Sequence, residues 1–426
     1  MKNIFKYASL LMAAAMLCLV SCQGTIDPEE GGNGNTENNG GNNNGNGGNG
    51  NNQGGNAGSD EDLVLRLFSD RNLLQTNVDV ATLTVTLGDE VVTEGVELYD
   101  GNNNKVDLPE FKFKAEADGE YVFWALYGTY TSEEITIKAI DMAIPDSPED
   151  PEPDNTSFKT RVMLTEFTTV GCSACPSMKR VLHGLETDKN EDGTLKYADV
   201  LDKLVFTECH SGLINRVADP CYLHNQAFED FCAITGFPTL KFDIDYLQKQ
   251  QDKGMISSTV NDLHAAKAPI APGIAVNSSK VGSDVAFKVT VKAAVDGEYR
   301  VGAFLLEDGI YAQQTNIKTG EEYMNTHNNV IRYVDSQYKG SFYGMPLTDI
   351  LAGKTADIMF AWDLDEIWEY GTEKGAINGG IEWPERVDGN LHMVVYVSMK
   401  DADGNYFIAN VIDCPLSGET PFEYAD

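Results

Sequence analysis

Two cysteines three positions apart stand at the junction between a strand pattern and a helix pattern, and this junction constrains the fold more than any other feature of the chain. Residues 161–167 are typical of a buried strand, and apolar side chains at helical spacing follow in residues 178–185. Cys172 and Cys175 lie between the two patterns, so Cys175 is expected in the first turn of the helix. A buried strand followed directly by a helix predicts an α/β domain in this region.

The same junction predicts different chemical roles for the two cysteines. Free amides and the macrodipole at the start of a helix stabilise a thiolate, which lowers the pKa of a cysteine placed there. Cys172 is therefore the predicted nucleophile. Cys175 can attack the mixed disulfide that Cys172 forms with another protein and so release that partner in its reduced form. The pair predicts thiol-disulfide exchange without a cofactor.

Two more positions resemble the surroundings of the cysteine pair in thioredoxins. The Gly-Phe-Pro-Thr segment at residues 236–239 stands where thioredoxins carry a cis-proline loop that faces the cysteines, which implies that Pro238 holds the substrate strand. Glu166 precedes Cys172 by six positions, where thioredoxins carry a buried acid that moves a proton to the resolving cysteine. The alternative is a solvent-facing glutamate at a strand end. Gly171 replaces the tryptophan that is usual before the first cysteine, which implies a different docking of the substrate.

The beginning of the chain predicts export and lipid attachment. Lys2 and Lys6 form a positive region, residues 8–17 are apolar, and residues 19–22, Leu-Val-Ser-Cys, resemble the cleavage site of bacterial lipoproteins. The apolar run is too short for a membrane-spanning helix. We therefore expect a signal peptide at residues 1–21 and a lipidated Cys22 that anchors the mature chain to a membrane.

The segment after Cys22 predicts a tether. Residues 22–58 are dominated by Gly and Asn, which offer nothing to bury and cannot offset the entropy of ordering. Acidic residues at positions 27, 29 and 30 resemble the surface-export signals of Bacteroidota lipoproteins, and the acidic start of a solvated linker has the same pattern. Exposure at the cell surface is therefore one of two expectations.

The remaining chain predicts a multidomain protein of α/β and all-β parts. Residues 59–144 alternate between apolar and polar with turn clusters between the runs, a pattern that resembles bacterial immunoglobulin-like β-sandwiches. Residues 145–157 are rich in Pro, Asp and Glu and predict a stiff acidic linker. Residues 158–268 predict a thioredoxin-like α/β domain. Alternation returns in residues 269–426, which we expect to form a C-terminal β-sandwich with an insertion.

The charge of the chain bears on its partners. It carries 66 acidic and 31 basic side chains, for a formal net charge of −35. A surface of this sign repels the phosphate backbone, so we expect no nucleic-acid partner. The acidity is typical of an exported protein kept soluble by its charge.

The other cysteines gather near the pair. Cys209, Cys221 and Cys232 precede Pro238, and we expect one local disulfide among them, with the odd thiol free or paired with Cys414. The sequence leaves the pairing open.

Cys209 and His210, together with Cys172 and Cys175, offer the ligand types of a zinc site. We expect no metal there, because a cysteine pair at a helix start is more often a redox pair and a lone histidine at a strand end is more often structural.

The region from about residue 158 onward resembles the twenty-eight-kilodalton outer-membrane-protein family of Bacteroidota. Residues 167–176, Phe-Thr-Thr-Val-Gly-Cys-Ser-Ala-Cys-Pro, resemble its F-T-G-x-x-C-x-x-C-P signature, with Thr169 where Gly is usual. The Glu-Asp pair at 307–308, Gln313 and residues 327–332 resemble its E-D, Q and H-N-H-V-x-R segments. Asn329 replaces the second histidine, which argues against paired histidines binding a metal. The resemblance implies an outer-membrane lipoprotein with a thioredoxin-like core.

Two functions of different classes fit these features. The first is a membrane-tethered thiol-disulfide oxidoreductase acting on the thiols of envelope or surface proteins, with Cys172, Cys175, Pro238 and Glu166 as its site. The second is a non-catalytic surface interaction or binding protein in which Cys172 and Cys175 form a structural disulfide. Three tryptophans lie close together in the C-terminal region: Trp362, Trp368 and Trp383. They indicate either that this region binds a glycan or a peptide, or that the three side chains pack in its core.

Overall fold

The computed structural model describes residues 64–88, 90–210, 217–248, 252–347, 349–377 and 382–425. The expected signal peptide, Cys22 and the Gly/Asn-rich tether lie outside these residues. The described chain is a multidomain α/β protein in which strands, arranged in several sheets, predominate over helices. Within these ranges no helix combines the length and the apolar character that crossing a membrane requires.

Residues 65–140 form two sheets with one shared core. The first sheet contains β1 (Leu65–Ser69), β3 (Ala81–Leu87), β4 (Glu90–Val91) and β7 (Lys112–Phe113). The second contains β2 (Leu73–Gln75), β5 (Val96–Asp100), β6 (Lys105–Val106), β8 (Gly119–Tyr127), β9 (Tyr130–Thr131) and β10 (Ile135–Ile140), and the helical turn η2 (Pro109–Phe111) precedes β7. Every second residue of β3 is buried, as the alternating sequence predicts for a strand with one face in the core.

The strand that precedes the cysteine pair belongs to a larger, nine-stranded mixed sheet. Its order is β14 (Tyr246–Gln248), β13 (Thr239–Phe242), β11 (Val162–Thr168), β12 (Leu204–His210), β20 (Val330–Asp335), β17 (Tyr299–Glu307), β23 (Leu391–Lys400) and β24 (Tyr406–Pro415), and β21 (Met345–Pro346) pairs with β17. β12 pairs in parallel with β20 where Glu208 lies opposite Val330. Strands from both sides of the expected domain boundary at residue 268 are thus joined in one sheet.

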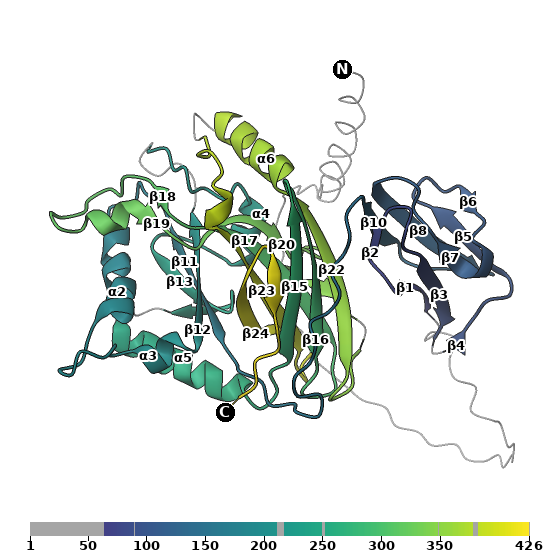
Figure 1. The fold of residues 1–426 in the computed structure, drawn as a ribbon, viewed down its shortest axis with the longest axis horizontal. Helices are drawn as coiled ribbons and strands as arrows, with labels where there is room; N and C mark the ends of the chain where they lie inside the picture. The colour runs from purple at the N-terminus through teal and green to yellow at the C-terminus, as the bar shows by residue number, and fades with distance from the viewer. Residues whose placement is uncertain are drawn as a thin grey trace, which may run out of the picture. The chain divides into compact units, whose positions relative to one another are not determined.

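Helices cover both faces of the part of this sheet that contains the cysteines. α2 (Cys175–Thr187) and α5 (Lys253–Lys267) pack on one face of β11, β12 and β13, with α3 (Ala198–Leu201) beside them (Figure 1). α4 (Gln226–Phe231) packs on the other face through Phe228. Because side chains alternate along a strand, Leu164 of β11 faces α2 and its neighbour Met163 faces the opposite core.

A four-stranded sheet covers the C-terminal half of the large sheet. It contains β22 (Thr355–Asp363), β16 (Asp284–Lys292), β15 (Gly273–Val281) and β25 (Gly418–Thr420), and its core is shared with β17, β23 and β24. α6 (Leu364–Ile377) follows β22, and the helical turn η4 (Asp388–Asn390) precedes β23. The three clustered tryptophans, Trp362, Trp368 and Trp383, are buried in this core. Of the two roles expected for these tryptophans, the structure shows core packing.

Two shorter segments complete the architecture. β18 (Ile310–Tyr311) and β19 (Thr326–His327) form a small ribbon between β17 and β20, and the helical turn η3 (Glu322–Asn325) precedes β19. The acidic segment at residues 145–157 is held along part of its length: Lys292 Nζ lies 2.8 Å from Asp150 Oδ2 and donates to the carbonyl of Glu152 at 3.0 Å.

Candidate active site

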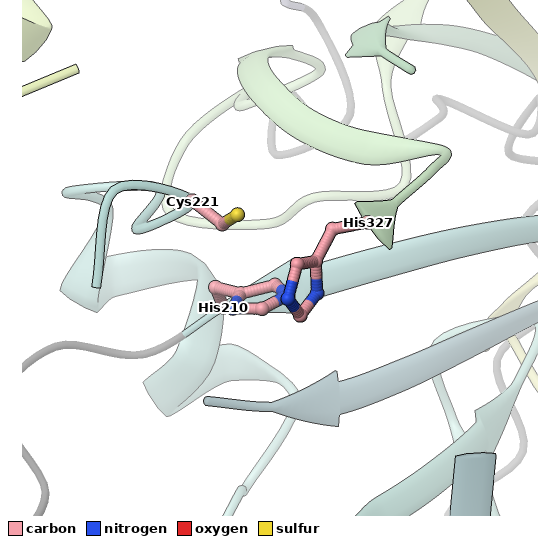
Figure 2. A group of neighbouring side chains, drawn as sticks. All are labelled: His210, Cys221 and His327. Carbon is pink, nitrogen blue, oxygen red and sulfur yellow. The ribbon is translucent and has the colours of Figure 1, made fainter. Parts of the chain in front are cut away.

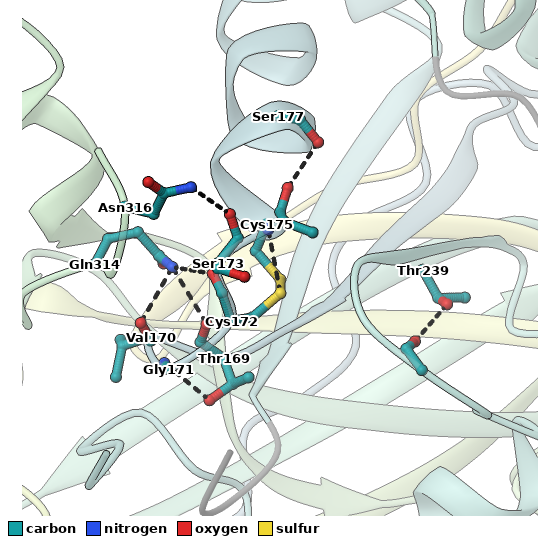
Figure 3. Close-up of a disulfide and its surroundings, with 12 residues drawn as sticks. Thr169, Val170, Gly171, Cys172, Ser173, Cys175, Ser177, Thr239, Gln314 and Asn316 are labelled. Atoms are coloured by element: carbon teal, nitrogen blue, oxygen red, sulfur yellow. Dashed lines mark hydrogen bonds between the residues drawn. A yellow bond between two sulfur atoms is a disulfide. The ribbon is translucent and has the colours of Figure 1, made fainter. Parts of the chain in front are cut away.

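The cysteine pair forms a disulfide at the start of α2. Cys172 lies in the turn after β11 and Cys175 is the first residue of the helix, with 5.5 Å between their Cα atoms (Figure 3). The backbone N–H of Cys175 donates to Cys172 Sγ at 3.1 Å. A helix-start amide directed at this sulfur stabilises a thiolate on Cys172 once the disulfide is reduced. Both cysteines are buried, Cys172 with 6% of its surface exposed and Cys175 with none.

Gln314, three residues after β18 ends at Tyr311, holds the turn before the disulfide. Its Nε2 lies 3.2–3.3 Å from three backbone carbonyls of that turn, those of Thr169, Val170 and Cys172 (Figure 3). The neighbouring Gln313, which the family resemblance singles out, is exposed. Asn316 Nδ2 donates to the carbonyl of Ser173 at 2.9 Å. The segment between β17 and β20 therefore fixes the backbone on which Cys172 lies.

Two buried glutamates lie side by side on the face of the sheet that α2 covers. Glu166 of β11 is directly opposite Glu208 of β12 in the parallel register, and Lys179 of α2 places its Nζ 2.8 Å from Glu208 Oε1. Burial, with the charge of Glu208 added, raises the pKa of Glu166 to about 8. Burial alone would raise the pKa of Glu208 as well, but the positive charge of Lys179 and the two nearby histidines hold it well below its ordinary value. At neutral pH Glu166 is therefore protonated and Glu208 is ionised.

A partly open cavity of about 380 Å³ gives Glu166 a route to solvent. Its wall includes Glu166, Lys179 and Glu208 from α2 and the sheet, and Tyr323 and Asn328 from the segment around β19. A buried acid that exchanges protons with an active site needs such a path. The structure thus buries Glu166, and it is not the solvent-facing strand-end residue that the sequence left as the alternative.

The Gly-Phe-Pro-Thr loop lies at the end of β11 where the cysteine turn begins. Thr239 pairs with Phe167 in the antiparallel β11–β13 register, which places Pro238 next to the last residue of β11. The peptide bond between Phe237 and Pro238 is cis, and Thr239 Oγ1 donates to the carbonyl of Gly236 at 2.7 Å (Figure 3).

The expected disulfide among Cys209, Cys221 and Cys232 is absent, and this expectation is corrected: all three are free and buried, as is Cys414. Cys209 and Cys232 pack in the apolar core around Phe228, whereas Cys221 packs in a separate cluster with Val170. Burial raises the pKa of each thiol, to about 12 for Cys232, and so suppresses the thiolate that disulfide formation needs. Cys209 faces this core on the opposite side of β12 from Glu208, so the sequence-based grouping with Cys172 and Cys175 does not form a ligand set.

His210 and His327 both contact Glu208 and so form one buried charged cluster with Glu208 and Lys179. His210 Nδ1 lies 2.8 Å from Asp219 Oδ2, and His210 Nε2 lies 2.6 Å from Glu208 Oε1. Burial alone would lower the pKa of His210, but these two carboxylates raise it to about 9. Asp219 Oδ2 also accepts the backbone N–H of Val170 at 2.9 Å, so the cluster is tied to the turn that carries Cys172.

Sequence reasoning missed four residues around the cysteine turn: Lys179, Glu208, Asp219 and Gln314. His327 was singled out only through the family resemblance, and its contact with Glu208 was not predicted. The one available signal was the alternation in residues 204–210, which places Glu208 on the same strand face as Leu204. The pairing register that brings Glu208 beside Glu166 is not contained in that pattern.

Comparisons with known proteins assign no family. No protein-family model and no curated protein matches the chain. Among solved structures, HBP35 of Porphyromonas gingivalis aligns with a TM-score of 0.43 and 16% identity over 61% of this chain and 76% of its own. A protein from Agrobacterium tumefaciens aligns with a TM-score of 0.36 and 11% identity over 61% of this chain and 95% of its own. Similarities this low leave the geometry of the site as the basis for function.

Proposed function

We propose that this chain is a thioredoxin-like thiol-disulfide oxidoreductase that acts on proteins of the bacterial cell envelope. The observation that carries the proposal is the Cys172–Cys175 disulfide at the start of the 13-residue helix α2, directly after a strand that carries the buried, protonated Glu166. A static disulfide needs neither a helix amide on one sulfur nor a buried acid with a raised pKa. A redox pair uses both.

The reaction follows from these positions. A substrate thiolate attacks Cys172 Sγ, the Cys172–Cys175 bond breaks, and a mixed disulfide forms between the substrate and Cys172. Cys175 leaves as a thiolate and takes a proton from Glu166. A second substrate thiolate then attacks the substrate sulfur of the mixed disulfide and releases the Cys172 thiolate, so the substrate loses two electrons and the pair gains them.

The reverse sequence reduces a substrate disulfide. Glu166 first releases its proton to solvent through the cavity that it lines. The Cys172 thiolate attacks the substrate disulfide, the Glu166 carboxylate accepts the proton of Cys175, and the Cys175 thiolate resolves the mixed disulfide. Pro238, at the end of β11 beside the cysteine turn, is the residue that we propose to hold the substrate strand.

The proposed location is the outer membrane, through a lipid on Cys22. The first β region, residues 59–144, then acts as an immunoglobulin-like spacer beyond the Gly/Asn-rich tether, and the partners are thiols of envelope or surface proteins. Cys22→Ala should release the protein from the membrane fraction, since no other anchor is proposed. Retention in the outer-membrane pellet after carbonate washing would rule out this anchor.

The test of the proposed function is trapping with two matched variants expressed in the native envelope. Cys175→Ala keeps the nucleophile but loses the resolving thiol, so mixed disulfides with partner proteins should accumulate on non-reducing gels. Cys172→Ala, which keeps the other cysteine of the same pair, should trap none. Equal results from the two variants would contradict the assignment of roles.

One observation favours the second candidate, a structural disulfide in a non-catalytic binding protein. Both cysteines are buried, and Gln314 fixes the turn before them, which limits access to Cys172. After reduction, an alkylating agent at mildly acidic pH separates the two candidates. A redox pair labels much faster at Cys172 than at Cys175, whereas a structural pair labels slowly and equally at both.

A further inference from the structure

We propose that His210, Cys221 and His327 bind a divalent transition-metal ion of the zinc class, at a site separate from the cysteine pair. His210 ends β12, Cys221 lies in the loop that follows, and His327 ends β19 (Figure 2). One ligand atom from each residue lies within 4.8 Å of the others, and none of the three side chains is exposed to solvent. The end of β12 with its following loop and the distant β19 thus bring two imidazoles and a thiol close together.

Hydrogen-bond partners on the outer side of each ring orient both histidines. The Nδ1 of His210 is held by Asp219 Oδ2 at 2.8 Å, and the Nε2 of His327 is 3.3 Å from the carbonyl oxygen of Ala312. The other nitrogen of each ring points at Glu208 Oε1, at 2.6 Å for His210 and 3.0 Å for His327. Histidines that bind metals commonly donate their outer N–H to a carboxylate or a carbonyl, which turns the inner nitrogen toward the ion. Both histidines show this arrangement.

Asp219 fixes the third ligand as well. Its Oδ1 accepts the backbone N–H of Cys221 at 2.9 Å, so one carboxylate orients His210 and holds the backbone of Cys221. Tetrahedral zinc with nitrogen and sulfur ligands needs ligand atoms about 3.3–3.8 Å apart, as bond lengths of about 2.0–2.3 Å require. The ligand atoms here lie within 4.8 Å of one another, so they must come closer by up to about 1 Å. Rotation of the Cys221 side chain can shorten the distances between its sulfur and the two nitrogens.

The position where the nitrogens converge already holds a positive charge. Lys179 Nζ lies 2.7 Å from His327 Nδ1 and 2.8 Å from Glu208 Oε1, so an ion bound to His327 takes the place of this ammonium group. Asp219 and Glu208 lie 2.8 Å and 2.6 Å from the two ring nitrogens of His210 and supply negative charge beside the ion.

The ligand types select the class of ion. Imidazole and thiolate suit Zn²⁺ and its tetrahedral substitute Co²⁺, whereas Mg²⁺ and Ca²⁺ prefer oxygen ligands. Three protein ligands also leave a fourth position beside Glu208, next to the cavity that Glu208 lines. The site depends on neither the redox state nor the function of the cysteine pair.

The experiment is a Co²⁺ and Zn²⁺ titration of the full, untagged chain with Cys172 and Cys175 replaced by Ser, so that a reductant can be present and the pair cannot bind metal. One Zn²⁺ per chain should bind, and Co²⁺ should give a thiolate-to-cobalt charge-transfer band with the visible absorption of tetrahedral coordination. Cys221→Ser should abolish that band, and His327→Gln should weaken Zn²⁺ binding by more than about 100-fold. Cys414→Ser, which removes another buried free thiol, should change neither result.

Two results would overturn the proposal. One is absence of the charge-transfer band in the parent, a measurement that requires no further substitution and so does not depend on whether a variant folds. The other is a band of full intensity in Cys221→Ser, which would place the metal at a different thiol. Neither result bears on thiol-disulfide exchange by Cys172 and Cys175, which trapping measures independently.

Discussion

Glu166 and Glu208 are neighbours on adjacent strands, but their surroundings shift their pKa values in opposite directions. Burial dominates at Glu166 and keeps it protonated, whereas the ammonium of Lys179 lies 2.8 Å from Glu208 and keeps it ionised. The spacing to Cys172, matched to thioredoxins, pointed to Glu166 as a buried acid and left a solvent-facing glutamate as the alternative. It was not sufficient to predict Lys179 and Glu208, because their roles depend on a helix-to-sheet contact and on a strand register that no local pattern encodes.

Glu166→Gln should stabilise the protein increasingly as pH rises from about 4.5 to about 8. Glu166 has an ordinary pKa of 4.5 and a folded-state pKa of about 8. Between these values the unfolded chain releases this proton and the folded chain retains it, so the parent loses stability with rising pH, by at most about 1.4 kcal/mol per pH unit. Glutamine has no such proton. The melting midpoint of the transition that includes this sheet, followed against pH in metal-free buffer, measures the difference.

Glu423→Gln is the control, because its effect on stability should change with pH in the opposite direction. Its hydrogen bond to Arg161, at the N-terminal end of β11, lowers the pKa of Glu423, so that carboxylate stabilises the fold above its ordinary pKa and not below it. Its loss should cost under about 1 kcal/mol, because the pair is partly exposed. Parallel pH curves for Glu166→Gln and the parent would show that Glu166 is not the protonated acid described here.

At the scale of elements, local patterns predicted the strand and the helix on either side of the cysteines. Short strands that depend on long-range contacts were not predicted. Residues 161–167 were expected as a strand and are found as β11, and the helical spacing in residues 178–185 is found within α2. The ribbon of β18 and β19 was not predicted. Its strands are two residues each and gain their position from Gln314 and His327, whose partners lie more than 100 residues earlier in the chain.

Gln314→Ala should increase the alkylation rate of reduced Cys172. Gln314 contacts three carbonyls of the cysteine turn, and losing a net hydrogen bond of about 1 kcal/mol should raise the open population of the turn about fivefold. Gln313→Ala is the matched control, since the same side chain is removed one position away where it is exposed. Labelling followed by mass spectrometry gives both rates. Equal acceleration, or none, in the two variants would mean that Gln314 does not restrict access to Cys172.

At the scale of the whole molecule, the large sheet joins the α/β region to the C-terminal β region. A sequence that changes from helix-containing to purely alternating at about residue 268 predicts two domains, because periodicity reports which elements form and not which strands pair. In the structure the edge of β12 is paired with β20, and Phe228 packs against Phe304 and Phe342 from the later region. The surroundings of the cysteine pair therefore depend on residues from both parts.

A fragment of residues 158–268 should not fold by itself. It would expose the edge of β12 and the apolar face that β17 and β23 cover, where each buried aromatic side chain contributes about 1.5–3 kcal/mol. A fragment of residues 145–426 retains these contacts and should fold. Circular dichroism and sedimentation compare the two, and cooperative unfolding of a monomeric 158–268 fragment would show that the expected boundary separates independent domains.

The central claim, that Cys172 and Cys175 exchange disulfides with other proteins, is tested most directly by the reduction potential of the pair. The amide of Cys175 and the start of α2 stabilise the Cys172 thiolate, which favours the reduced form and raises the potential. Equilibration in thiol redox buffers, followed by alkylation mapped to the two residues, gives the value. We predict a potential between about −270 and −120 mV, the range of thiol-disulfide oxidoreductases. A potential below about −300 mV would identify a structural disulfide and contradict the proposed function.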